Sequence, residues 1–261
     1  MRIIVHAGFH KTGTSSVQIG LLQNREALAE HAAIFLRDDI LPMVKAARRF
    51  SIQRDPESLG GFSTRSARWL SGLGEQQCTI LIATEDIVGA MPGRVGVQDY
   101  SALPPLMQAL EAAAQQRFGD ALEFVVYLST RAPDRWIESL WWQHLRSTRF
   151  SMSLDEYRQE TAQTAKLSRV VDDVRAHLKT GRVVCHALED LTKSPEGVMT
   201  PINDLLNLPQ ALRLPVPETV NQRPDVGLEP VFLALNRSGL PDELVSRSKR
   251  QLLRSLRRQV E

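Results

Sequence analysis

The sequence predicts an α/β fold in which a parallel β-sheet is flanked by helices on both faces. Short apolar runs rich in Val and Ile alternate along the chain with longer segments of helical spacing, and no internal repeat interrupts them. These runs are almost continuously apolar, as in strands that are buried on both faces. The 261 residues, 43% of them hydrophobic, suffice for one large domain with a full core.

The predicted strands follow one another at wide intervals, with room for a helix between most of them. In chain order they cover residues 2–7, 33–36, 79–83, 122–129 and 182–186, of which 33–36 is the shortest. Strands that alternate with helices indicate a parallel sheet. In such a sheet ligands bind at the carboxyl ends of the strands, so we look for functional residues there.

The predicted helices cover residues 14–30, 65–73, 103–117, 154–178 and 242–260, and a further helix begins at Pro133. Val17, Leu21 and Leu28 give the first of these segments its helical spacing. Pro133 suits the first turn of a helix, where its missing N–H is not needed. Residues 53–64 and 89–105, both rich in Gly and Pro, are predicted as surface excursions, and the second is either a lid, an acceptor rim or a disordered loop.

Composition and charge narrow the class of protein. A formal net charge of +2 argues against a dedicated nucleic-acid binder. The chain contains no stretch of about 18 apolar residues and no charged-then-apolar leader, so we expect a cytoplasmic protein without a transmembrane segment. Cys78 and Cys185 are isolated and each lies beside an apolar run, which predicts reduced core thiols rather than a disulfide or a metal site.

The segment 2–18, RIIVHAGFHKTGTSSVQ, predicts a phosphate-binding loop between the first strand and the first helix. Gly8 and Gly13 allow backbone conformations in which several N–H groups point at one anion, and the helix that begins near Thr14 adds its positive end. Nucleoside triphosphatases place lysine directly after the second glycine, where this chain has Thr14. Lys11, three residues earlier, instead sits at the outer end of a bound phosphate chain. We therefore expect group transfer from an anhydride without a metal ion.

A second segment, residues 123–145, predicts another site at the carboxyl end of a strand. Arg131 follows the buried strand, and Ser139 comes eight residues later in the next helix. A guanidinium and a hydroxyl group together suit a dianionic phosphate. Arg135 shares the helical face of Ser139 and either joins the phosphate or pairs with the neighbouring Asp134 or Glu138.

The first segment resembles the 5′-phosphosulfate loop of the sulfotransferases that use 3′-phosphoadenosine 5′-phosphosulfate (PAPS). The match consists of His6, Gly8, Lys11, Thr12, Gly13, Thr14, Ser15 and Ser16. Arg131 and Ser139 resemble the pair by which this family holds the 3′-phosphate. The resemblance implies a P-loop-like sulfotransferase fold and transfer of a sulfuryl group from PAPS to a hydroxyl or amine, with adenosine 3′,5′-bisphosphate as product. The implied cofactor-binding residues are Lys11, Thr12, Gly13, Thr14, Ser15, Ser16, Arg131 and Ser139.

Sulfuryl transfer needs positive charge at the leaving oxygen and a base for the acceptor proton. Lys11 is the candidate for the first role. We expect Glu85 to be the base, because it follows the strand 79–83 where cytosolic relatives carry their catalytic histidine. Asp38 or Asp39, and His10 inside the loop, stay open as alternatives, and His10 can instead contact the sulfate. Glu85 can also be a simple first-turn carboxylate of a helix, a role that its neighbour Asp86 would serve equally well.

We expect a single domain over residues 1–261, with residues 241–261 as a basic amphipathic helix. Packing of this helix on the domain or on a twin subunit is the favoured interpretation, and contact with an anionic membrane is the other. Glu189, Asp190 and Leu191 resemble a structural turn of the family. Arg223 is interpreted as a solvated turn residue.

The acceptor class stays open among carbohydrates, lipids and small molecules, because fold does not fix substrate. Two other functions compete with the sulfotransferase interpretation. A P-loop kinase or other nucleotide phosphotransferase would need a lysine after Gly13 and a carboxylate that holds a metal ion. A cofactor-binding module without catalysis would keep both phosphate motifs and transfer nothing.

Overall fold

The computed structural model describes residues 1–74, 79–217 and 227–260, and the side chains of all of these except 256–260. The chain forms two compact units. The first consists of Met1–Ala132 and Lys166–Asn221, and the second of Pro133–Ala165 and Gln222–Glu261. The expectation of a single domain over residues 1–261 stays a prediction.

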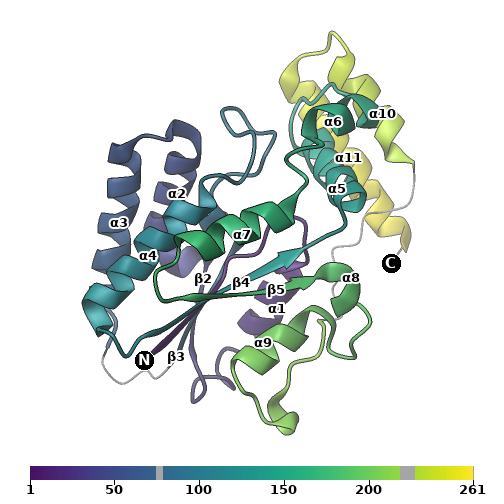
Figure 1. Ribbon diagram of the computed structural model, residues 1–261. Helices are drawn as coiled ribbons and strands as arrows, with labels where there is room; N and C mark the ends of the chain where they lie inside the picture. The colour runs from purple at the N-terminus through teal and green to yellow at the C-terminus, as the bar shows by residue number, and fades with distance from the viewer. Residues whose placement is uncertain (75–78, 218–226, 261) are drawn as a thin grey trace. The chain divides into compact units, whose positions relative to one another are not determined.

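The first unit contains a five-stranded sheet in the order β2-β3-β1-β4-β5, and every neighbouring pair is parallel (Figure 1). Its strands are β1 Arg2–His6, β2 Ala33–Leu36, β3 Thr79–Ala83, β4 Glu123–Thr130 and β5 Arg182–Ala187. All five lie where the apolar runs predicted them. Because β1 is the central strand, its carboxyl end meets those of β3 and β4 at one edge, which is the edge expected to bind ligands.

Helices cover both faces of this sheet, which confirms the predicted fold class. Figure 1 shows α2 Leu41–Gln53, α3 Pro56–Ser71, α4 Leu103–Phe118 and α7 Leu167–His177 on one side, and α1 Thr14–Gln23 and α9 Thr200–Leu205 on the other. The core beneath α1 and α9 joins Ile4, Leu81 and Val125, which are paired across three strands. Shorter turns complete the unit: η1 Arg37–Ile40, η2 Glu85–Val88, α8 Leu188–Leu191, η3 Gly197–Met199 and η4 Gln210–Leu212.

Two of the predicted boundaries are wrong for identifiable reasons. The predicted surface excursion 53–64 is mostly helix, because the Asp55 side chain accepts from the Ser58 N–H at 2.7 Å and Pro56 occupies the first turn of α3. The predicted helix 14–30 ends at Gln23, where the Asn24 N–H bonds back to Gly20. Helix α2 has no counterpart among the predicted elements.

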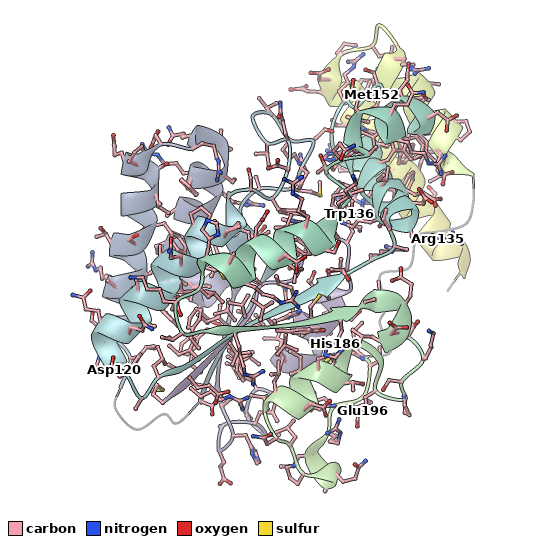
Figure 2. The ribbon with its side chains drawn as sticks, viewed as in Figure 1. Asp120, Arg135, Trp136, Met152, His186 and Glu196 are labelled. Carbon is pink, nitrogen blue, oxygen red and sulfur yellow. The ribbon has the colours of Figure 1, made fainter. Side chains whose placement is uncertain are left out.

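The second unit is a group of helices: α5 Pro133–Ser147, α6 Leu154–Thr161, α10 Leu228–Arg237 and α11 Asp242–Val260. The predicted helix 154–178 is therefore two helices, α6 here and α7 in the first unit. Trp136, Trp141 and Trp142 are buried, and Trp142 stacks on Phe232 with ring centroids 5.4 Å apart. Figure 2 labels Trp136 among the side chains of α5. The tryptophans are thus packing residues of an amphipathic helix.

The C-terminal helix α11 packs within the second unit through a buried lysine. The Lys249 ammonium donates to the carbonyl oxygens of Leu145 at 2.9 Å and Thr148 at 2.7 Å, and to Asn236 Oδ1 at 2.8 Å. It thereby caps the carboxyl end of α5, where carbonyl groups have no partner inside the helix. Arg247, Arg250 and Arg254 are exposed, and the side chains of Leu256, Arg257 and Arg258 lie outside the described residues.

Among the described residues no helix is long and apolar enough to cross a membrane, and no group of three His, Cys, Asp or Glu side chains could hold a metal ion. Cys185 is a free thiol in β5, and burial raises its pKa. Cys78 and Arg223 lie outside the described residues.

Candidate functional site

The loop between β1 and α1 has left-handed backbone at three positions, with φ of 49° at Gly8, 71° at Lys11 and 92° at Gly13. A Cβ at Gly8 would lie 2.3 Å from Thr14 Cγ2, and one at Gly13 would lie 2.9 Å from Val198 Cγ1. Both glycines are therefore required by conformation and by space. Lys11 has no such freedom, and a non-glycine residue in this region is strained.

The hydroxyl of Thr12 fastens this loop to the sheet. Thr12 is buried, its Oγ1 donates to the Phe9 carbonyl at 2.6 Å, and it lies 2.7 Å from Ser129 Oγ on β4. Because the Thr12 hydroxyl has one hydrogen and gives it to Phe9, Ser129 is the donor in the second bond. The Thr12 side chain therefore holds the loop in place, and the backbone N–H of Thr12 can donate a hydrogen bond to an anion.

Helix α1 begins directly after this loop. Gly13 is the N-cap residue, and no side chain among the described residues caps the helix there. The first turn, Thr14, Ser15 and Ser16, carries hydroxyl groups and no carboxylate. Thr14 is buried and Ser15 is exposed. A helix N-terminus without a side-chain cap has a positive dipole end and is suited to an anionic group.

Arg131 connects the second sequence segment to this loop. It follows β4, and its Nη1 donates to the carbonyl oxygen of Lys11 at 3.2 Å. The next residue, Ala132, donates its N–H to the Glu189 carboxylate at 2.9 Å, so the turn that begins α8 steadies the end of β4. Two segments 120 residues apart thus meet at Lys11.

Ser139 lies on α5 in the second unit and is half-buried. Because Arg131 belongs to the first unit, their joint binding of one phosphate stays a prediction. Arg135 is exposed and lies 4.0 Å from the Glu138 carboxylate, one of the two partners expected for it (Figure 2).

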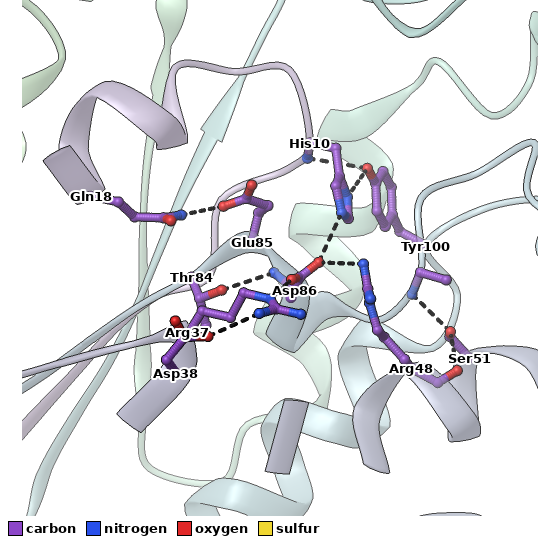
Figure 3. A network of polar contacts seen from close by, with 11 residues as sticks. His10, Gln18, Arg37, Asp38, Arg48, Ser51, Thr84, Glu85, Asp86 and Tyr100 are labelled. Atoms are coloured by element: carbon purple, nitrogen blue, oxygen red, sulfur yellow. Dashed lines mark hydrogen bonds and ion pairs between the residues drawn. The ribbon is translucent and has the colours of Figure 1, made fainter. Parts of the chain in front are cut away.

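Glu85 lies at the carboxyl end of β3, as expected, and is the first residue of η2. The Gln18 side-chain amide on α1 donates a hydrogen bond to Glu85 Oε2 (Figure 3). Gln18 is four residues after Thr14, one turn into the helix. The candidate base and the amino end of α1 are therefore tied together by a direct contact.

Asp86, the next residue, is buried and is the centre of a charged cluster. Arg37 Nε donates to it at 2.7 Å and Arg48 Nη2 at 2.9 Å, and its own N–H donates to Thr84 Oγ1 at 3.2 Å (Figure 3). Burial by itself would raise the pKa of Asp86, but the contact with His10 and the charges of Arg48 and Arg37 outweigh it and hold the pKa at about 2. Asp86 is thus ionised and fixes the side chains around it. The sequence predicts it only as a first-turn carboxylate of a helix.

The alternative bases Asp38 and Asp39 both accept hydrogen bonds from arginine side chains. The Asp38 side chain is 88% exposed and accepts from Arg37 at 2.9 Å. Asp39 accepts from the Arg25 guanidinium and from the Leu36 N–H. Burial opposes ionisation of Asp39, but these hydrogen bonds prevail and hold its pKa below the usual range. An ion-paired carboxylate of this kind is a weaker proton acceptor than an ordinary one.

Sequence reasoning missed several residues that position this site. Gln18, Arg37, Arg48 and Ser129 all contact the predicted site residues, and no motif or spacing links them to those residues. The sequence assigns no role to Tyr100, which lies in the 89–105 segment. It is buried, and its hydroxyl lies 2.9 Å from His10 Nδ1.

No protein-family model matches this chain, and no curated protein matches it. Among solved structures, the chain is similar to the crystal structure of a sulfotransferase from Alicyclobacillus acidocaldarius. The TM-score is 0.48 and the sequence identity 17%, over 89% of this chain and 91% of that chain. A likeness of this degree shows neither a family nor an activity for this chain.

Proposed function

We propose that this chain is a sulfotransferase that moves a sulfuryl group from PAPS to a hydroxyl or amine of a carbohydrate, lipid or small molecule. The observation that carries the proposal is the contact of Arg131 with the Lys11 carbonyl. It brings the guanidinium expected for a 3′-phosphate to the loop expected for the 5′-phosphosulfate. A second phosphate site has no use in binding ATP, whereas a 3′-phosphorylated adenosine requires one.

The residues of the loop fit this donor. Its three left-handed positions and the uncapped amino end of α1 suit the 5′-phosphate. The Lys11 ammonium supplies positive charge where the leaving oxygen becomes negative. The acceptor oxygen or nitrogen attacks sulfur, the bond from sulfur to the bridging phosphate oxygen breaks, and that oxygen keeps the electron pair.

Glu85 takes the proton that the acceptor loses. Its Oε2 is held by Gln18, so the carboxylate keeps one orientation beside α1, and Oε1 is the oxygen left to reach an acceptor. Asp86 does not compete for this role, because Arg37 and Arg48 already occupy both of its oxygens.

Calorimetric titration separates the sulfotransferase from a P-loop kinase. We expect tight binding of adenosine 3′,5′-bisphosphate that does not change when magnesium is removed. Lys11→Ala should weaken it, and the exposed Lys193→Ala should leave it unchanged as a matched control. A preference for ATP with magnesium over the bisphosphate would sink the proposal in favour of a kinase.

Replacing the candidate base tests the assignment of the proton. Glu85→Gln should keep bisphosphate affinity and lower the transfer rate by at least about 100-fold, as expected for loss of a general base. Glu57→Gln on α3 is the control, since that side chain is 87% exposed. Unchanged turnover in Glu85→Gln would move the role to Asp39 or His10. If the wild type binds the bisphosphate but sulfates no member of a broad acceptor panel, the silent binding module is the better description.

A further inference from the structure

The backbone and the ring of His10 are held by Tyr100, from the 89–105 segment, and by Asp86 (Figure 3). Its backbone N–H donates to the Tyr100 hydroxyl at 3.2 Å, and its ring Nδ1 lies 2.9 Å from the same oxygen. The two rings are stacked, with an interplanar angle of 9°. On the other side of the ring, Nε2 lies 3.7 Å from Asp86 Oδ1. One tyrosine therefore holds both the backbone and the side chain of the residue before Lys11.

These contacts select one form of the neutral imidazole. The Asp86 carboxylate is ionised and can only accept, so the ring proton belongs on Nε2, which faces it. Nδ1 then has a lone pair, which accepts the Tyr100 O–H. The reverse arrangement would turn the Nε2 lone pair toward a negative charge. The Tyr100 hydroxyl is used in both directions, since it accepts from the His10 N–H and donates to the His10 ring.

Tyr100 and Asp86 are themselves held firmly. Tyr100 is 1% exposed, and its ring packs on Phe9 with centroids 4.9 Å apart. Asp86 is fixed by Arg37 and Arg48. Both anchors therefore restrain the two residues that precede the left-handed Lys11.

We propose that Asp86 and Tyr100 are positioning residues that hold His10 with its proton on Nε2 and thereby fix the strained backbone of Lys11. His10 is then a strut of the phosphate loop and not the proton acceptor. The consequence for transfer rests on the proposed sulfotransferase function, because it needs Lys11 to act on the leaving oxygen. The form of the ring and the rigidity of the loop do not depend on that function.

Tyr100→Phe tests the proposal with the loss of a single oxygen. Nitrogen NMR of the His10 ring in the ligand-free protein, at mildly alkaline pH, should show a proton on Nε2 in the wild type and also in Tyr100→Phe, because Asp86 still faces Nε2 in that variant. Amide hydrogen exchange of His10 and Lys11 should become about ten-fold faster, as expected for the loss of one hydrogen bond. Affinity for adenosine 3′,5′-bisphosphate should fall by a similar factor.

Tyr157→Phe is the matched control, because the buried Tyr157 hydroxyl has no hydrogen-bond partner within the described part of the chain. It should change none of the three measurements. Asp86→Asn is the second variant: it removes the negative charge that faces Nε2, so the share of rings with the proton on Nδ1 should rise.

A proton on Nδ1 in the wild type would overturn the proposal, and so would unchanged exchange at Lys11 in Tyr100→Phe. If the ring and exchange results hold but the wild type binds no bisphosphate, the sulfotransferase function fails and the positioning role stands.

Discussion

At the scale of single residues, Lys11 combines an unfavourable backbone with the most important charge of the candidate site. Its φ of 71° belongs to a region that costs an L-residue about 1–2 kcal/mol. The Thr12 hydroxyl, bonded to Ser129, and the Tyr100 hydroxyl, bonded to the His10 N–H, tie the loop on either side of Lys11 to its surroundings. A glycine would adopt this conformation more easily, so the ammonium group is the reason to have lysine there.

Two substitutions at this position separate the side chain from the backbone. Lys11→Ala and Lys11→Gly both remove the ammonium and should weaken bisphosphate binding to the same extent. Lys11→Gly should be more stable than Lys11→Ala by about 1 kcal/mol, because only glycine tolerates the left-handed conformation. Urea unfolding of the two variants measures the difference, and equal stabilities would show that the loop relaxes when the lysine is lost.

His6 makes stability depend on pH. It lies beneath the loop, fully buried and stacked on Tyr127, and burial lowers its pKa from 6.5 to about 4. Between these pH values the unfolded chain binds a proton that the folded chain does not. The titration of His6 should therefore not lower the free energy of unfolding above pH 6.5. As the pH drops from 6.5 to 4, it should lower the free energy of unfolding by about 3 kcal/mol.

His6→Phe is the variant that tests this, since it keeps a ring against Tyr127 and cannot titrate. The change in unfolding free energy between the two pH values should be smaller in this variant by about 3 kcal/mol. The same slope in both proteins would place the acid sensitivity at another group.

The residues of the candidate site differ in how far they could be predicted. Lys11, Gly13 and Glu85 could be found because they belong to a motif or follow a strand. Arg37, Arg48 and Gln18 could not, because each reaches the site from a neighbouring element by tertiary packing. Gln18 lies 67 residues from Glu85 in the sequence. Arg37 and Arg48 lie 49 and 38 residues from Asp86.

At the scale of elements, strands could be predicted better than helices. The strands are continuous apolar runs, as expected for parallel strands that are buried on both faces. Helix α3 was missed in part because Gly60 and Gly61 are typical of loops, yet the cap at Asp55 and the helical N1 position of Pro56 start it before them. Local capping was stronger here than helix propensity.

Lys249 stabilises the carboxyl end of α5 by donating to its carbonyl oxygens. Burial, and then the charge of Arg149, lower the pKa of Lys249 to about 8, so the amine is still mostly charged at neutral pH. Lys249→Met should reduce the unfolding free energy by about 3 kcal/mol, because it leaves buried oxygens of Leu145, Thr148 and Asn236 without this donor.

Lys193→Met is the control for this loss. Lys193 is 75% exposed and pairs with Asp190 on the surface, so its removal should leave the free energy of unfolding nearly unchanged. Chemical unfolding measures both variants, and equal losses would mean that the buried amine contributes no more than a surface one.

At the scale of the whole molecule, the two units have separate cores. The first is built on the parallel sheet, and the second on the tryptophans of α5 with Phe232. We expect Lys249→Met to accelerate amide hydrogen exchange in α5, α10 and α11 while leaving the strands β1, β3 and β4 unchanged. Mass-spectrometric exchange resolves these segments. Equal acceleration in the strands would show that the two units unfold as one.

The second unit is assembled from segments that are distant in the chain, 133–165 and 222–261, and this has a consequence for synthesis on the ribosome. The sheet has all its strands once Ala187 has emerged, but Trp142 must wait for Phe232, and the end of α5 must wait for Lys249. Phe232 follows Trp142 by 90 residues, and at about 5–20 residues per second their synthesis takes roughly 5–20 s. For that time α5 presents its tryptophan face to the cell, where chaperones or other nascent chains can bind it.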